Sequence, residues 1–231
     1  MTAGIIESSI ACLLTIAAFV SARGLARLAE GHPLANPVLV GALIVATFLI
    51  ALDVSVPDYL TAAHPLMDAL DLAIVALGYG LVQQLRGSLS RLGPALIAIV
   101  TSLIVGVGSA VGLAIAFDLP GDFVDALSVK TVSSGFAVAI MERVAGPPSL
   151  AAGLVIATGM IGALSFPILF RKLRIADAES RGIATGMAAH IVGTESLFRA
   201  DARAGAWAAL AMALAGLIAG VALPLLWRVF A

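Results

Sequence analysis

The sequence predicts an all-α polytopic membrane protein, with about six full transmembrane helices and two oppositely oriented re-entrant or broken helices. The composition is 61% hydrophobic and only 12% charged, with a mean hydropathy of +1.10. A soluble domain would have roughly 25% charged residues. Apolar windows of about 15 to 23 residues recur along the chain, and this length crosses roughly 30 Å of hydrocarbon. Polar motifs interrupt two of these windows. We therefore place the chain in a lipid bilayer.

The apolar segments share a high density of glycine and alanine, which allows membrane helices to pack closely. In chain order they are Ile5–Leu28, Pro37–Leu52, Leu66–Leu85, Pro94–Phe117, Phe123–Met141, Ser149–Phe170, Ile183–Phe198 and Gly205–Phe230.

Charged residues in the connecting loops predict the orientation. Arg23 and Arg27 lie at the end of the first apolar segment, and Arg86 and Arg91 follow the third. The loops Asp53–Pro65 and Asp118–Asp122 contain acids and no lysine or arginine. Cytoplasmic loops of membrane proteins collect Lys and Arg. We therefore expect a multi-pass protein of the cell inner (cytoplasmic) membrane with its N-terminus outside.

The same rule predicts that two segments do not cross fully. The next basic cluster, Arg171–Arg174, reaches the cytoplasm only if Phe123–Met141 enters from outside and returns there. By the same count Ile183–Phe198 is re-entrant from the cytoplasm. The two units repeat one order of polar motif, break and glycine-bearing helix in opposite orientations, which predicts an inverted repeat. A fully spanning but kinked helix at either place is the alternative.

We expect one integrated membrane domain with two functional parts. Residues 1–93 form the N-terminal helices, which we interpret as a scaffold, and residues 94–231 form the inverted-repeat transport region with both broken segments. The favoured assembly is a homodimer with the early helices as its fixed part.

The first polar motif predicts an anion site. Lys130 is followed by Thr131, Ser133, Ser134 and Gly135. An ionisable residue at membrane depth is a functional-site hypothesis by default. The hydroxyls and the free N–H groups at a helix start would bind a carboxylate, and Lys130 would complete the site. Snorkelling of Lys130 to the interface is the alternative.

The second motif contributes His190, Gly193 and Thr194 to the same expected substrate site. His190 either donates a hydrogen bond to the ligand, carries a proton or bonds between helices. Glu195 is a candidate charge partner of Lys130 or a coupling group, or it faces water at the interface. Tyr79, between two glycines, is a further candidate substrate contact.

Several function classes are excluded by what the sequence lacks. It has one cysteine, Cys12, and three histidines far apart, so no metal-ligand spacing occurs. It has no phosphate loop and no nucleophile elbow. We therefore expect no enzyme activity, no catalytic residues, no metal and no cofactor. The net charge of −1 gives no support for a nucleic-acid partner.

The motifs together resemble the LrgB/CidB family, which includes bacterial membrane proteins and the plastid glycolate/glycerate translocator. The matching stretches are Asn36-Pro-Val-Leu-Val40, Ala73-Ile-Val-Ala-Leu-Gly-Tyr79, Ser128-Val-Lys-Thr-Val-Ser-Ser134 and Arg181-Gly-Ile-Ala-Thr-Gly-Met-Ala-Ala-His190-Ile-Val-Gly-Thr194. Two positions depart from the family pattern. Gly135 stands where a proline often follows, and Glu195 stands where a small residue often follows.

The resemblance implies two competing functions. One is transport of small monocarboxylates such as glycolate, glycerate, lactate or pyruvate by alternating access. The other is a holin/antiholin-like protein that regulates murein hydrolase activity and lysis, with a small LrgA-like membrane protein as a further partner. A wide unspecific pore has no use for a buried lysine beside a hydroxyl-rich break, so we favour the transporter.

Overall fold

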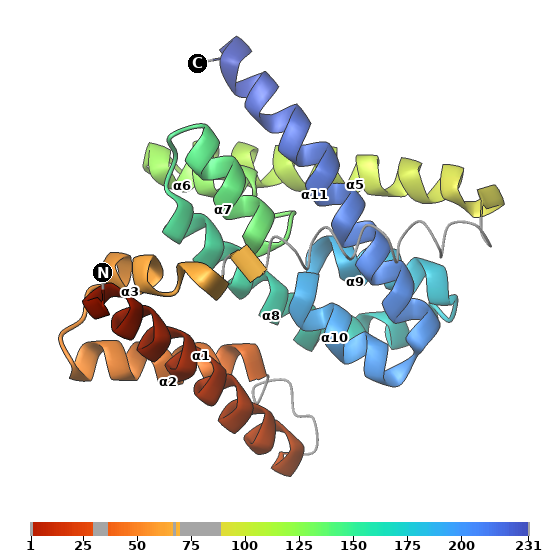
Figure 1. Cartoon of the computed structure of the whole chain (residues 1–231). Coiled ribbons are helices and arrows are strands. Elements are labelled where there is room, and N and C mark those ends of the chain that lie inside the picture. The colour runs from red at the N-terminus through yellow and green to blue at the C-terminus, as the bar shows by residue number, and fades with distance from the viewer. Residues whose placement is uncertain (1, 30–36, 67, 70–88, 231) are drawn as a thin grey trace. The chain divides into compact units, whose positions relative to one another are not determined.

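The computed structural model describes residues 2–29, 37–66, 68–69 and 89–230. The chain divides into two compact units, Met1–Leu77 and Gly78–Ala231 (Figure 1). The third expected span, Leu66–Leu85, lies almost entirely outside the described residues, and so does Tyr79.

The first unit contains helices α1 (Thr2–Leu28), α2 (Pro37–Ala51) and α3 (Val56–Ala62). The loop expected at Asp53–Pro65 therefore contains a short helix. Its start is capped by Ser55, whose side chain accepts a hydrogen bond from the Asp58 amide at 3.2 Å. The α2 and α3 axes are bent by 115° at the break between them.

The second unit contains the elements that position the site. In chain order they are α5 (Leu89–Ala116), α6 (Gly121–Ser128), α7 (Ser134–Arg143), α8 (Pro148–Lys172), α9 (Ala178–Ala188), α10 (His190–Ala200) and α11 (Ala202–Phe230). α5 begins before Pro94, the expected start, so this proline lies inside the helix and lacks the N–H that would bond the preceding turn.

Four of the described helices are long and apolar enough to cross a membrane: Ile6–Leu28, Arg91–Ala116, Pro148–Lys172 and Ala202–Arg228. Large apolar side chains on them are exposed, for example Ile104 at 68% and Val221 at 65%. Such exposure is unfavourable in water and favourable in hydrocarbon. The described residues therefore form an all-helical, multi-pass membrane protein.

The hydrophobic core of the second unit surrounds the chain between α6 and α7. Val129 and Val132, which belong to this connection, are almost fully buried together with Ile99 of α5 and Met141 of α7. The interruption between α6 and α7 therefore lies inside the packed protein, where non-helical backbone is tolerated at membrane depth.

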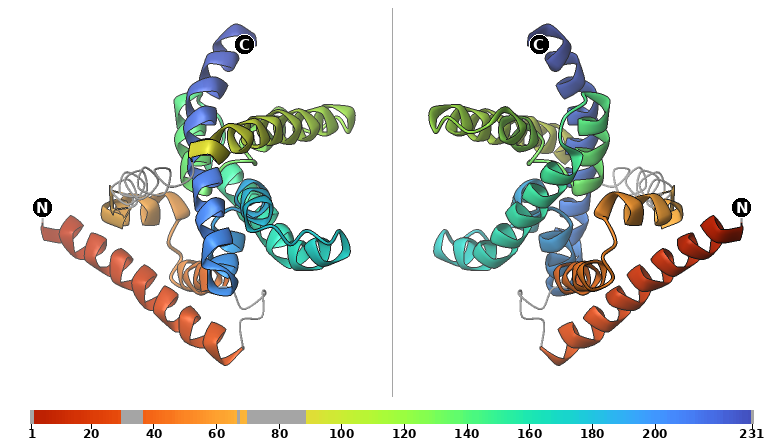
Figure 2. Two further views of the ribbon diagram at one scale, coloured as in Figure 1. Left: turned by 90° about the vertical axis from the view of Figure 1, so that its right-hand side faces the viewer. Right: turned by 90° about the vertical axis from the view of Figure 1, so that its left-hand side faces the viewer.

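α9 packs against α11, and the views of Figures 1 and 2 show the two helices side by side. A Cβ atom on Gly182 would collide with the Ala204 carbonyl oxygen, and one on Gly186 would collide with the Ala208 carbonyl oxygen. Small residues allow this close approach between membrane helices. The contact fixes α9, and therefore the start of α10, on the surface of α11.

Gly186→Ala tests this packing. The added methyl group has no space, and overpacking typically costs about 1–3 kcal/mol, so we expect a lower unfolding temperature in detergent. The matched control is Gly153→Ala on α8, where an added Cβ would meet nothing within 4 Å. There alanine should leave stability unchanged or raise it by about 0.5–1 kcal/mol. Equal unfolding temperatures for the two variants would contradict the close α9–α11 contact.

Candidate functional site

The first interruption consists of residues 129–133. α6 ends at Ser128 and α7 begins at Ser134. Only short turns link the two helices, through hydrogen bonds from the Lys130 amide to the Leu127 carbonyl and from the Val132 amide to the Val129 carbonyl, both at 3.2 Å. The interruption expected at the lysine motif is therefore present, and the lysine itself lies in it.

The second interruption is short and consists of Ala189, between the two helices, and the left-handed first residue of α10. α9 ends at Ala188, α10 begins at His190, and His190 has a φ of 47°. Gly193 and Thr194 lie in the first turns of α10, so regular helix resumes within the second motif. One residue in the left-handed region redirects the chain, so no longer loop is required.

The two interruptions are joined by a hydrogen bond. The His190 Nε2 atom lies 2.9 Å from the Lys130 carbonyl oxygen, and the His190 side chain is only 3% exposed. A carbonyl oxygen only accepts, so Nε2 carries the hydrogen in this contact. The bond satisfies a backbone acceptor in the interrupted segment, where the regular helical pattern is lost.

Glycines on two neighbouring helices make room for the interruptions. A Cβ on Gly106 of α5 would lie 2.8 Å from the Thr131 Oγ1 atom. A Cβ on Gly162 of α8 would lie 2.8 Å from the Ala188 carbonyl oxygen and 2.7 Å from the Ala189 Cβ. Each interruption therefore packs directly on a helix that lacks a side chain at the contact.

A cavity of about 410 Å³, which we call the lysine cavity, opens beside the first interruption. It is lined by Thr101, Ser102, Val105, Gly106, Lys130, Thr131, Thr158, Phe166, Ala184, Met187 and Ala188. Its volume lies in the range of small-molecule sites. The lining combines one amine with the hydroxyls of four side chains and contains no acid. Such a lining can bind a small anion.

Within the described residues, no acidic side chain forms an ion pair with Lys130. The Thr131 Oγ1 atom is also buried without a hydrogen-bond partner. The lysine cavity therefore has both a positive charge and a hydroxyl that its protein neighbours leave unpaired.

The other candidates within the described residues lie outside this cavity. Ser133 is the residue before α7, and Ser134 and Gly135 form the first turn of that helix. His190 and Thr194 are buried beside the second interruption. Of the candidates within the described residues, only Lys130 and Thr131 line the lysine cavity.

Glu195 is not the charge partner of Lys130. It forms an ion pair with Arg199 at 2.5 Å, one helical turn further along α10. Residues four apart lie on the same helical face, so this local pairing is geometrically direct. In the described structure Glu195 therefore pairs with Arg199 and forms no ion pair with Lys130.

The sequence did not indicate three of the hydroxyls that line the lysine cavity, those of Thr101, Ser102 and Thr158. The available signal was their position inside otherwise apolar spans. This signal is weak, because such hydroxyls commonly bond their own helix. Thr158 does so, donating to the Leu154 carbonyl at 2.8 Å. Among the described residues, no three His, Cys, Asp or Glu side chains lie close enough together to hold a metal ion.

The fold and cavity define a multi-pass helical membrane protein with a small polar cavity beside an interrupted helix. The model of the LrgB-like family matches residues 15–229. The chain therefore belongs to that family, as the motifs indicated.

Curated relatives align with most of the chain. An uncharacterised protein of Bacillus subtilis, YxaC, is 27% identical over 220 residues, 94% of each chain. The holin-like protein CidB of Staphylococcus epidermidis is 25% identical over 203 residues, 86% of this chain and 87% of CidB. CidB of Staphylococcus aureus is 21% identical over 225 residues, 97% of this chain and 98% of CidB. No solved structure gave a significant match.

His190→Ala tests the link between the interruptions. Loss of the ring leaves the Lys130 carbonyl without this donor, and a buried unsatisfied group costs about 1–3 kcal/mol. We expect a lower unfolding temperature of the purified protein in detergent. His190→Gln is the matched variant, because its amide can still donate, and it should recover part of the loss. Equal losses for Ala and Gln would show that ring packing, not the hydrogen bond, stabilises the site.

Proposed function

We propose two competing functions for this chain: a membrane protein of the holin/antiholin kind, and a carrier whose lysine cavity selectively admits small organic anions. The family match and the name "holin-like" of the CidB relatives support the first function. These names favour the holin-like interpretation over carboxylate transport, for which they offer no support. The second function rests on the lysine cavity alone.

The observation that carries the anion proposal is the unpaired Lys130 amine. A charge held away from water is unfavourable unless an opposite charge or hydrogen-bond partners compensate it. Lys130 has no acidic partner among the described residues, and it shares its cavity with the hydroxyl of Thr131. A carboxylate in this cavity would supply the missing charge.

The hydroxyls favour a particular class of carboxylate. Thr101, Ser102 and Thr158 can donate or accept hydrogen bonds, and they line the same cavity as Lys130. Small monocarboxylates with a neighbouring hydroxyl or oxo group, such as glycolate, glycerate, lactate or pyruvate, would use both the amine and the hydroxyls. We propose this class as the substrate.

Alternating access is the transport mechanism that we propose. Interrupted helices that meet at a central site are typical of carriers that expose the site to each side in turn. The proposal includes six full spans, two opposed re-entrant segments related as an inverted repeat, and an outside N-terminus in the inner membrane. Residues 1–93 would be the scaffold of a homodimer, and residues 94–231 the moving part.

The holin/antiholin-like function is the candidate that the names of the relatives support. As a holin/antiholin-like protein, the chain would regulate murein hydrolase activity and lysis, with a small LrgA-like membrane protein as its partner. Oligomerisation into a pore would then replace alternating access. The two candidates differ in selectivity, because a wide pore passes unrelated solutes and a carrier does not.

Uptake into proteoliposomes separates the candidates. A carrier takes up labelled glycolate or pyruvate while a trapped fluorescent dye is retained. Lys130→Ala should then weaken uptake by about 10- to 100-fold, since a hydrogen bond to a charged group contributes about 1.5–3 kcal/mol. Lys172→Ala is the matched control, because Lys172 is the other lysine of the chain and lies outside the lysine cavity. It should retain normal uptake.

Two outcomes contradict carboxylate transport. Release of the dye at the same protein density would support a pore and the holin-like candidate. Normal uptake by a correctly folded Lys130→Ala protein would remove the amine from the mechanism and, with it, the argument for an anion.

A further inference from the structure

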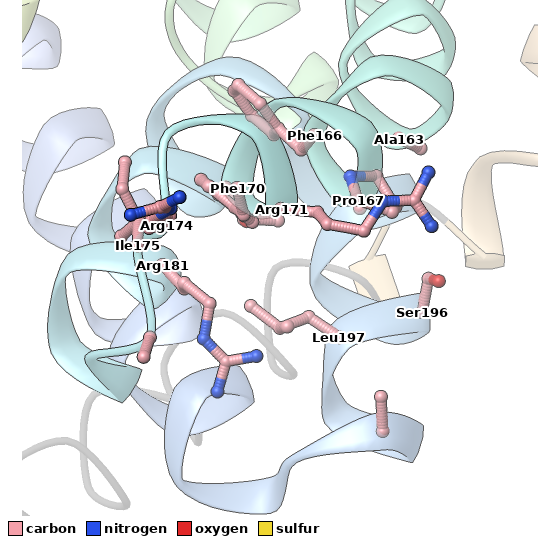
Figure 3. A pocket seen from close by; sticks show the side chains of 14 residues that line it. Ala163, Phe166, Pro167, Phe170, Arg171, Arg174, Ile175, Arg181, Ser196 and Leu197 are labelled. Carbon is pink, nitrogen blue, oxygen red and sulfur yellow. The ribbon is translucent and has the colours of Figure 1, made fainter.

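A second and larger cavity lies where α8 ends and α9 begins. It has a volume of about 540 Å³, and we call it the arginine cavity. It is lined by Ala163, Phe166, Pro167, Phe170, Arg171, Arg174, Ile175, Ala176, Arg181, Thr185, Gly193, Ser196, Leu197 and Ala200. Figure 3 shows the arginine side chains of α8, the following turn and α9 around the same opening as Leu197 and Ser196 of α10.

The charge of this lining is positive. It contains three arginines and no acid. Arg181 forms an ion pair with Asp201, and the pKa of the Asp201 carboxyl lies below its usual value, chiefly because the Ala204 amide donates a hydrogen bond to it. Within the described residues, no ion pair involves Arg171 or Arg174. These two guanidinium groups can therefore bind a solute.

Buried polar groups of the lining also lack partners. The Thr185 Oγ1 atom has no hydrogen bond, and the Thr185 residue is only 3% exposed. The Arg181 Nε atom is likewise buried without a partner. Buried polar atoms usually have partners, so an anion or a water that arrives in this cavity would satisfy them.

The arginine cavity and the lysine cavity share one lining residue, Phe166. Its ring stacks on that of Phe170, with centroids 5.2 Å apart and planes at 15°. α9 contributes to both cavities, with Thr185 facing the arginine cavity and Ala184 and Ala188 facing the lysine cavity. The stacked pair therefore lies at the boundary between the two.

We propose that the arginine cavity is an entry site for small organic anions and that Phe166 is the partition between it and the lysine cavity. This inference rests on the proposed anion function of the lysine cavity. Arg171 and Arg174 raise the local concentration of anions, and Arg181 and Thr185 bind the carboxylate inside the opening. Movement of the Phe166 ring then admits it to Lys130.

Thiol labelling tests the entry site without a transport assay. Cys12→Ser removes the single cysteine, and Ser196→Cys then places a thiol in the lining of the arginine cavity. Ser196 is exposed, and its neighbour Glu195 is paired with Arg199. In vesicles of neutral phosphatidylcholine, an anionic methanethiosulfonate should react faster than a cationic one. Added glycolate or pyruvate should slow the reaction.

Removing the charges of Arg171 and Arg174 tests whether they cause the difference between the two labelling rates. Concave charged sites raise local counter-ion concentration by about tenfold or more, so Arg171→Gln with Arg174→Gln should lower the anionic-to-cationic rate ratio about tenfold. Lys172→Gln is the matched control, because Lys172 lies between the two in sequence but does not line the cavity. It should change the ratio by less than about twofold. Equal effects of the arginine and lysine changes would overturn the proposal.

An anionic lipid headgroup is negatively charged like the proposed ligand, so it is a second possible source of the anion that these arginines bind. Vesicles that contain phosphatidylglycerol distinguish the two. Protection by free carboxylate in phosphatidylcholine vesicles supports a solute entry site. Protection by phosphatidylglycerol alone, with none by carboxylate, would assign the arginines to lipid and overturn the proposal.

The partition is tested with a thiol in the other cavity. Thr158→Cys, in the Cys12→Ser background, places a thiol in the lining of the lysine cavity. Phe166→Ala should increase its labelling rate about tenfold or more, as expected for anions that gain entry from a charged cavity. Phe166→Leu, which retains an apolar side chain, should give a smaller increase. An unchanged rate in Phe166→Ala would show that Phe166 is not the partition.

Failure of this inference is distinguishable from failure of the proposed function. Normal uptake that depends on Lys130, together with labelling at position 196 that ignores charge and carboxylate, would overturn the entry site alone. Loss of both carboxylate uptake and carboxylate protection would overturn the anion function and this inference with it.

Discussion

The hydrogen bond from His190 to the Lys130 carbonyl is the interaction on which the arrangement of the site depends. Hydrocarbon provides no partner for backbone groups that leave a regular helix, so a chain that interrupts its helices at membrane depth must supply partners itself. Here one interruption contributes the acceptor and the other contributes the donor. The two segments are 60 residues apart in the sequence. The same hydrogen bond therefore holds them together and supplies the partner that the interrupted backbone needs.

Close backbone packing is the second requirement. Gly106 lies against Thr131, and Gly162 lies against Ala188 and Ala189. A side chain at either glycine would push the interrupted segment away from its neighbour. The unpaired amine of Lys130 and the hydroxyl of Thr131 thus line a defined cavity, because the neighbouring helices have glycine, which lacks a side chain, at positions 106 and 162.

The sequence predicted the all-helical membrane fold and located both interruptions, because polar residues inside apolar spans are a strong signal. It also selected Lys130 and Thr131, which line the cavity. It did not predict the left-handed conformation of His190, since a single left-handed residue leaves little trace in composition. It suggested Lys130 as one partner of Glu195, but the structure pairs this acid with Arg199, because a local helical pair needs no tertiary contact. Thr101, Ser102 and Thr158 were missed because a hydroxyl that faces a cavity resembles one that bonds its own helix.

The contact of Gly182 and Gly186 with the backbone of α11 has a mechanical consequence. Side chains between two helices can change rotamer and so allow the helices to slide past one another. Where main chain contacts main chain, no side chains can adjust in this way, and sliding would cause steric clashes. We therefore expect α9 and α11 to move as one rigid body, so that any movement of the proposed carrier would occur at another contact.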